Sequence, residues 1–490
     1  MKIKLILFLL LPGAAMAQYL INGILFMESP RASHTATLLQ DGRVLIAGGV
    51  NESCCSPSDP PLASAEIYDP ATPSLTSAGN MTTGRSGHTA TLLPDGRVLI
   101  VGGDSSNGTA EFYDPSTGKF TATGSLLMPQ SGFNATLLSN GKVLITGGAD
   151  AELFDPSTGQ FTSAGPYVAS LTGGFTTNAT TSTLLPDGTV LFAGEPAAQI
   201  YNPATATFSL SGSMYVSFSG SQVAPDYVDG QTATLLLNGT VLVAGGANED
   251  FGIFNSTELY NPASGAFVPA ASMLSPREDH TATLLPDGTV LMAGGLSEHC
   301  DGNSCFFSGS ESNMELYDPT KGTFSFAGYM LYPRVSHTAT LLNTGDVLIA
   351  GGDAWGGFDL NYGSLAQVEL YHPAFVSSPP ALFSAAGGAP GQGAVWHATT
   401  GQLASSQTPA VAGEILSMYV RGLAEGGAIP PQVAVGGRLA EILYFGDAPG
   451  YPGYYQVNFS LPSGLTPGPG VPVRLNYLSR TSNEIAIAVQ

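Results

Sequence analysis

Four pairs of basic residues share one spacing along the chain, and their side chains suggest a binding chemistry. In each pair an arginine stands three residues before a histidine: Arg31 and His34, Arg85 and His88, Arg277 and His280, Arg334 and His337. A guanidinium group holds a carboxylate or a sulfate through paired hydrogen bonds. Pairs that lie side by side could therefore form an anion-binding arc. Alternatively, each pair could serve the scaffold, with the histidine bonded to the backbone of a neighbouring unit.

Each of these histidines begins a phrase that occurs seven times, in variant forms, with a period of about 50 residues. In the first copy His34-Thr-Ala-Thr-Leu-Leu is followed by Asp41-Gly-Arg-Val-Leu-Ile-Ala-Gly-Gly. A unit contains two apolar runs joined by a tight turn, then two further strands around a Pro-x-Thr-Gly turn. Runs that are apolar throughout are typical of sheets buried on both faces. The repeat predicts an all-β, seven-bladed propeller over residues 18–387.

The repeated phrase resembles the kelch repeat, whose hallmarks are a Gly-Gly pair, a downstream Tyr and a later aromatic residue. The resemblance covers about residues 21–387, and it departs from the kelch pattern where Phe120 and Phe161 replace the usual Trp. It implies a kelch β-propeller with four antiparallel strands in each blade. The segment Ile21 to Phe26 aligns with the end of a fourth strand, so it could close the ring.

Antiparallel order places the start of the first strand and the connection between strands two and three on one face of the propeller. The tight turns lie on the other face, which should be smooth. Three of the connections are long and belong to blades one, six and seven, which are neighbours in a closed ring: residues 50–64, 296–313 and 353–367. Trp355, Phe358 and Tyr362 lie in the last of these connections. We therefore predict a ligand-binding arc of long connections, aromatic side chains and basic pairs.

All four cysteines lie in the same arc of connections. In an oxidising compartment a local disulfide between Cys300 and Cys305 is the simplest pairing. Cys54 and Cys55 could form a bridge with each other or reach across to the other connection.

The N-terminus has the pattern of a cleavable signal peptide over residues 1–17. Lys2 and Lys4 precede an apolar run, and Ala15-Met16-Ala17 offers a small-residue cleavage site. The run is too short to span a membrane, and no later stretch could do so. The mature protein is expected to be secreted or to lie at the cell surface or in the periplasm. A net charge of -22 disfavours nucleic-acid binding.

A second domain is expected over residues 405–490, after a linker at 388–404. Short alternating runs between Gly and Pro turns predict an immunoglobulin-like β-sandwich. The phrases Pro431-Gln-Val-Ala-Val-Gly-Gly and Asn483-Glu-Ile-Ala-Ile resemble an uncharacterised C-terminal domain of secreted acidobacterial proteins, over about residues 391–490. That family has no assigned activity, so the resemblance implies secretion and surface display.

Kelch propellers also carry copper-radical oxidases such as galactose oxidase, whose site needs a Tyr cross-linked to a Cys, a second Tyr and two His. Here the cysteines are clustered in pairs, and the C-terminal domain offers only His397. The strand-start histidines are spread around a channel, which argues against a shared metal. Glu278, Asp279 and Asp353 lie near the arc, where acidic residues are mostly solvated. The chain also lacks Gly-x-Ser-x-Gly, His-Glu-x-x-His and Walker motifs.

We therefore assign no catalytic residue, metal or cofactor, and predict a secreted protein that binds an extracellular ligand, either a glycan or an acidic peptide or protein. Two alternatives stay open: a carbohydrate-active enzyme such as a galactose-oxidase-like oxidase, and a structural cell-surface protein. The sequence predicts no particular oligomeric state.

Overall fold

The chain is all-β in the part that the structure covers. The computed structural model describes residues 25–51, 59–104, 108–128, 134–147, 150–167, 181–194, 197–214, 216–218, 221–223, 228–248, 250–301, 304–355, 363–373, 381–383, 393–421, 431–436, 438–448, 454–477, 480–481 and 485–490. No helix occurs in these residues, and so none of them forms a helix that could cross a membrane. The expected signal peptide lies outside the described residues.

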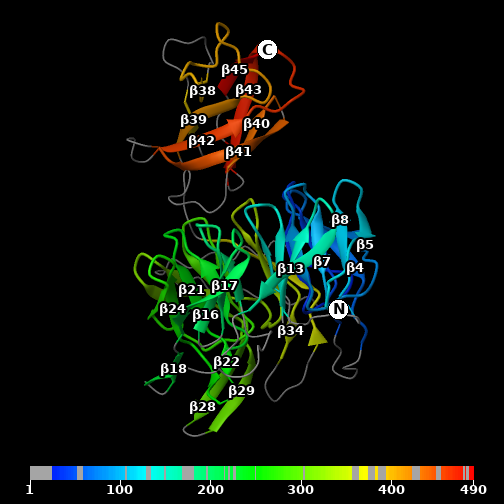
Figure 1. Cartoon of the computed structure of the whole chain (residues 1–490), viewed down its shortest axis with the longest axis vertical. Helices are drawn as coiled ribbons and strands as arrows, with labels where there is room; N and C mark the ends of the chain where they lie inside the picture. Colours follow the sequence, from blue (N-terminus) through cyan, green and yellow to red (C-terminus); the bar gives the residue numbers. More distant parts are fainter. Residues whose placement is uncertain are drawn as a thin grey trace, which may run out of the picture.

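Seven four-stranded antiparallel sheets form a β-propeller (Figure 1). Blade one consists of β2 (Thr35–Leu38), β3 (Val44–Ala47), β4 (Ser64–Asp69) and β5 (Ser74–Asn80). Blades two to four contain β6 (Thr89–Leu92), β7 (Val98–Val101), β8 (Ala110–Asp114) and β9 (Lys119–Ala122); β10 (Asn134–Leu137), β11 (Val143–Thr146), β12 (Asp150–Asp155) and β13 (Gln160–Pro166); β14 (Thr181–Leu184), β15 (Val190–Ala193), β16 (Ala197–Asn202) and β17 (Thr207–Ser213).

The remaining blades close the ring. Blades five to seven contain β20 (Thr232–Leu235), β21 (Val241–Ala244), β24 (Thr257–Asn261) and β25 (Ala266–Pro269); β26 (Thr281–Leu284), β27 (Val290–Ala293), β30 (Asn313–Asp318) and β31 (Thr323–Tyr329); β32 (Thr338–Leu341), β33 (Val347–Ala350), β36 (Gln367–Tyr371) and β1 (Leu25–Phe26). The innermost strands contact one another in order around the axis, and β32 contacts β2. Leu25 pairs with Val368, so the N-terminal strand completes blade seven, as the sequence predicted.

The core is repeated between successive blades. The second strand of a blade, such as β3 or β7, is buried along its whole length. Ala47 and Ile67 of blade one pack with Ile100 and Tyr113 of blade two in a single cluster. The recurring aromatic residues belong to these layers, and the rings of Tyr113 and Phe120 lie 4.8 Å apart. Apolar surface is thus buried on both faces of each sheet, which explains the absence of alternation in the sequence.

Short hairpins extend four of the connections. They are β18 (Val216–Phe218) with β19 (Ser221–Val223), β22 (Ala247–Asn248) with β23 (Gly252–Ile253), β28 (Leu296–Asp301) with β29 (Ser304–Ser310), and β34 (Asp353–Ala354) with β35 (Gly363–Ser364). In Figure 1 the hairpin β28–β29 projects from the end of the propeller that lies away from the C-terminal domain. The C-terminal domain therefore does not cover the face that carries these connections.

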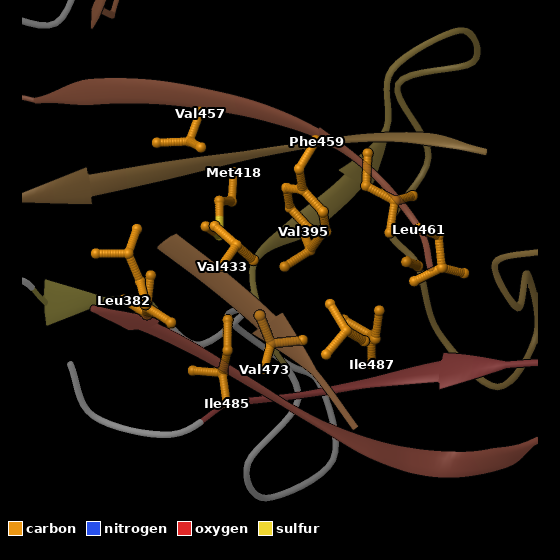
Figure 2. Packing of buried hydrophobic residues seen from close by; sticks show 14 of the residues in the cluster. Leu382, Val395, Met418, Val433, Val457, Phe459, Leu461, Val473, Ile485 and Ile487 are labelled. Atoms are coloured by element: carbon orange, nitrogen blue, oxygen red, sulfur yellow. The ribbon is translucent and has the colours of Figure 1, made fainter. Parts of the chain in front are cut away.

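The C-terminal domain is a β-sandwich whose sheets are joined through one long strand, β41. Its strands are β37 (Ala381–Leu382), β38 (Val395–His397), β39 (Ile415–Arg421), β40 (Gln432–Val435), β41 (Arg438–Asp447), β42 (Tyr455–Ser460), β43 (Gly468–Tyr477), β44 (Arg480–Thr481) and β45 (Ile485–Val489). Figure 2 shows its core, in which Met418, Phe459 and Ile487 are fully buried.

The boundary of this domain differs from the expected position at residue 405. Leu382 and Val395 both belong to the core, and β37 and β38 both pair with β39. Ala404, at the end of the expected linker, is also fully buried. The Gly-rich and Ala-rich composition suggested a linker, but the apolar residues within it complete the sandwich.

Candidate ligand-binding face

The four arginines of the predicted arc are fully buried and bind protein groups. Arg31 donates to Glu66 Oε1 at 3.1 Å, to the Gly48 carbonyl at 2.8 Å and to the Ser64 carbonyl at 3.0 Å. The guanidinium thereby ties the start of the inner strand to strands two and three of its own blade. The same arrangement joins Arg85 to Glu111 and Arg277 to Glu315, both at 2.7 Å, and Arg334 to Glu369.

The partner glutamates also hold the segment that enters each blade from the preceding one. Glu66 accepts the backbone N–H of Glu28 at 3.1 Å, and Glu111 accepts that of Thr82 at 2.7 Å. A buried carboxylate is stable only when its charge and its lone pairs are satisfied. Arginine and backbone N–H groups do this together here, and the fully buried guanidinium groups are therefore not presented to an external anion.

The four histidines join each blade to the one before it. His34 Nε2 lies 3.0 Å from Thr338 Oγ1 of blade seven, and His88 Nε2 lies 3.0 Å from Thr35 Oγ1 of blade one. The imidazole of His34 packs against Gly351, where a Cβ atom would stand 2.7 Å from the ring and 2.4 Å from the Arg31 carbonyl. The Gly-Gly pair therefore makes room for this contact. His280 and His337 repeat it with Thr232 and Thr281.

Burial keeps these histidines neutral. Desolvation, with a smaller contribution from the adjacent arginine, lowers the pKa of His88 and of His280 to about 3. The same causes lower the pKa of His34 to about 3 and that of His337 well below its usual value. A neutral, buried imidazole cannot contribute positive charge to an anion site.

The prediction that the basic pairs form a ligand-binding arc is therefore not supported, and we assign them to an interblade clamp. We use this name for the arginine, glutamate and histidine of blades one, two, six and seven, together with the threonine of the preceding blade that each histidine contacts. The sequence prediction overlooked the glutamate that pairs with each arginine. This glutamate stands two residues before the recurring Tyr in the third strand. This Glu-x-Tyr pattern is readable in the sequence: Glu66 and Tyr68, Glu111 and Tyr113, Glu315 and Tyr317, Glu369 and Tyr371.

In the five blades where this position is described, the residue that leads into the inner strand lies in the left-handed backbone region, on the same face. Ser33, Asp279 and Ser336, each just before a clamp histidine, have φ of 52°, 51° and 54°, and Gly87 and Gly230 hold the same register. Backbone hydrogen bonds link neighbours: Ser33 N–H to Ser336 O, Gly87 N–H to Ser33 O, and Asp279 N–H to Gly230 O. We call these five residues the axial rim. Non-glycine residues in this conformation are strained and tend to cluster at functional sites.

Asp279 is the charged member of the axial rim. Its side chain is exposed to solvent, yet desolvation by the surrounding protein raises its pKa. Sequence reasoning placed Asp279 near the arc but gave it no role; the glycines at the same register in other blades were the available signal.

The long connections of blades six, seven and one meet as predicted. Ser310 N–H donates to the Trp355 carbonyl at 2.9 Å, and Trp355 N–H donates to Ser310 Oγ at 2.9 Å. Ser364 Oγ then donates to the Val50 carbonyl at 3.2 Å. Trp355 is 45% exposed on this framework. Phe358 and Tyr362 lie outside the described residues.

The two cysteines of the expected local disulfide lie in the hairpin β28–β29. Cys300 and Cys305 face each other directly across the antiparallel pair β28–β29. Facing residues in such a pair have Cα atoms about 4.5 to 5.5 Å apart, within the range that a disulfide needs. The bridge itself stays a prediction, and Cys54 and Cys55 lie outside the described residues.

The opposite face is not smooth, which corrects the sequence expectation. A shallow hollow of about 600 Å³ lies between the tight turns of blades three and four. Its lining includes Asn140, Asp187 and Asn202, whose side-chain oxygens accept backbone N–H groups within their own turns. These polar atoms are committed to turn geometry, so the hollow offers little binding chemistry.

The described residues do not fit a copper site. Among them, no three His, Cys, Asp or Glu side chains come together in a way that could hold a metal ion. His397 uses both ring nitrogens, one with Glu414 Oε1 at 2.6 Å and one with the Thr408 carbonyl at 2.9 Å. Burial alone would lower the pKa of His397, but these hydrogen bonds raise it. The imidazole is thus held as a donor at both nitrogens, which is the reverse of a metal ligand.

Comparison with known proteins shows the fold and no closer relationship. No family model matches the chain, and no curated protein matches its sequence. Among solved structures, the chain is similar to a fungal alcohol oxidase of the AA5 family, described as having catalytic diversity and solved in complex with copper. The TM-score is 0.63 with 14% identity, over 96% of this chain and 99% of that chain. The likeness extends through both domains, and at this identity it concerns architecture alone.

Proposed function

We propose that the protein is a secreted kelch-type binding protein that recognises an extracellular glycan. The recognition surface, which we call the long-connection face, consists of the described residues of the connections of blades six, seven and one, together with the axial rim. The observation that carries the proposal is the exposed indole of Trp355, held between two connections by paired backbone interactions. An exposed indole suits stacking on the apolar face of a sugar ring.

The burial of the clamp arginines narrows the class of ligand that this face could bind. An acidic peptide was attractive only because four guanidinium groups seemed available. Each of them is neutralised by its own glutamate, as in the pair of Arg85 and Glu111 at 2.7 Å. A glycan needs hydrogen-bond partners for its hydroxyl groups and a surface for stacking, and the polar groups of the connections and the side chain of Trp355 can provide them.

Secretion and surface display complete the proposal. The first 17 residues supply the signal peptide pattern, and the C-terminal domain resembles a module of secreted acidobacterial proteins. The long-connection face points away from that domain in Figure 1. The sandwich could therefore serve in attachment while the propeller faces its ligand.

Replacing Trp355 with Ala should weaken glycan binding by about 30-fold or more, as truncation of a tryptophan anchor at a binding site commonly does. The measurement is a glycan array on the mature protein followed by calorimetry with the best ligand. Leu237→Ala is the control, because Leu237 is 43% exposed in the tight turn between β20 and β21, on the opposite face of the propeller. Equal affinities of both variants and the wild type would refute the proposed surface.

The second candidate is an oxidase, and the likeness to the AA5 alcohol oxidase favours it. Because the described residues provide no donor set for copper, we expect less than 0.1 equivalent of tightly bound metal after copper loading and dialysis, about tenfold below a stoichiometric site. Mass spectrometry of metal content checks this. One copper per chain, with visible absorbance from an organic radical, would favour the oxidase over the binding protein.

A further inference from the structure

The basic residues of the propeller are divided between its two faces. Between residues 25 and 383 the sequence contains nine Lys and Arg, and the four clamp arginines are buried. The other five all stand at tight turns on the face opposite the long connections: Arg43, Arg97, Lys119, Lys142 and Lys321. None of the connections on the long-connection face contains a lysine or an arginine other than the buried four. That face therefore has no exposed cationic side chain of this kind.

The carboxylates are distributed differently. On the described part of the turn face, four carboxylates pair with a lysine or an arginine, as in Arg43 with Asp41 at 2.6 Å and Lys321 with Asp318 at 2.6 Å, and others such as Asp187 accept N–H groups of their own turns. On the connection side of the propeller, carboxylates are exposed or half-exposed without such cations: Glu28, Asp250, Asp279 and Glu311. Uncompensated charges of one sign produce a surface potential of several kT at low ionic strength. The side of the propeller that carries Trp355 is thus negative.

We infer that the long-connection face excludes anions, so that the glycan proposed to bind there is uncharged. This rests on the proposed function and adds the class of ligand. An acidic glycan would bring its carboxylate or sulfate against like charge, and no exposed arginine or lysine could satisfy it. Hydroxyl groups, by contrast, can donate to carboxylates such as Glu311, next to the residue that holds Trp355. Selection would act by repulsion of the wrong ligand as much as by attraction of the right one.

The two tryptophans of the chain allow a direct test of the negative surface potential around Trp355. Trp355 lies on the face, and Trp396 packs edge-on against Tyr419 in the C-terminal domain. In a Trp396→Phe variant, Trp355 is the single tryptophan, and its fluorescence can be quenched by caesium, iodide or acrylamide. After normalisation to a free tryptophan analogue, caesium should quench about threefold or more better than iodide at about 0.01 M ionic strength. The preference should vanish at about 1 M, where the screening length is about 3 Å.

A charge-neutralising pair of variants locates the source of the field. Glu311→Gln removes one charge beside the Trp355 contact and keeps an oxygen to accept from Asn313 Nδ2. Asp187→Asn removes one charge from the turn face and can keep the turn bond to Thr189 N–H. We expect the caesium preference to fall in Glu311→Gln and to stay in Asp187→Asn. Equal quenching by caesium and iodide in the parent variant would overturn the inference.

Binding of matched glycans completes the test. The probes are one neutral oligosaccharide and its sulfated form, on the same array and at the same ionic strength. Binding of the neutral form at least tenfold tighter supports the inference. Equal binding of the sulfated form overturns it. If neither binds while the quenching asymmetry is present, the exclusion stands and the proposed glycan function fails.

Discussion

Acidification from pH 6.5 to about pH 4 should unfold the propeller, with an uptake of about four protons. His34, His88, His280 and His337 are buried and neutral, and desolvation lowers the pKa of the first three to about 3. In the unfolded chain an imidazole titrates near pH 6.5. The unfolded state therefore binds more protons than the folded state in this window, so the free energy of unfolding falls as the pH falls.

The free energy of unfolding should depend steeply on pH. Each proton bound only by the unfolded chain changes the free energy of unfolding by about 1.4 kcal/mol per pH unit. Four histidines together give about 5 kcal/mol per pH unit below pH 5.5, which is comparable to the whole stability of many domains. His397 acts in the opposite direction, because its pKa is raised in the folded domain and its contribution is lost as the pH rises. Its effect is confined to the sandwich.

Urea denaturation between pH 7 and pH 4 measures this slope, and histidine-to-glutamine variants assign it. Blade five already carries Gln231 at the position of the clamp histidine, where it is buried, so the scaffold accommodates glutamine. Each substitution, such as His88→Gln, should lower the slope by about one proton. A profile of wild type that is flat between pH 6.5 and pH 4 would contradict the buried, neutral state of these imidazoles.

The propeller was predictable from the sequence because its signals are local and repeated. The apolar runs, the Asp-Gly turns and the Gly-Gly pairs recur with one period, and each copy supports the others. The closing strand at Leu25 and Phe26 was also readable, because it aligns with the end of a fourth strand. The C-terminal boundary was misplaced because a single copy of weak alternation, around Val395 and Ala404, has no repeat to confirm it.

The role of the basic pairs was not predictable from their spacing alone. Arg31 and its partner Glu66 are 35 residues apart, and their contact forms because strand two returns to the face where strand one begins, so that strand three starts near the arginine. An arginine that looks exposed at the start of a strand is then enclosed by the connections above it. The axial rim was not predicted, because Ser33 and Ser336 adopt a left-handed backbone conformation that serine does not usually adopt. The prediction that the long connections of blades six, seven and one lie next to one another was possible, because their adjacency follows from ring closure.

Replacing Arg85 with Met should destabilise the propeller by about 3 to 5 kcal/mol, because it leaves the carboxylate of Glu111 buried without its cation. Arg85 also donates to the carbonyls of Gly102 at 2.7 Å and Thr109 at 3.0 Å, and methionine cannot replace these hydrogen bonds. The matched control is Arg43→Met, which breaks an exposed pair with Asp41 and should cost less than about 1 kcal/mol. The free energies come from urea denaturation at pH 7.

A second substitution separates the buried charge from the lost packing. Adding Glu111→Gln to the Arg85→Met variant removes the unpaired charge but keeps an oxygen for the Thr82 N–H. Part of the lost stability should return, and a double-mutant cycle gives the coupling between Arg85 and Glu111. If Arg85→Met were as stable as Arg43→Met yet lost its glycan ligand, the arginines would again be candidates for the binding site. A large loss of stability with binding retained in the folded fraction instead assigns the clamp to the scaffold and leaves recognition to the connections around Trp355.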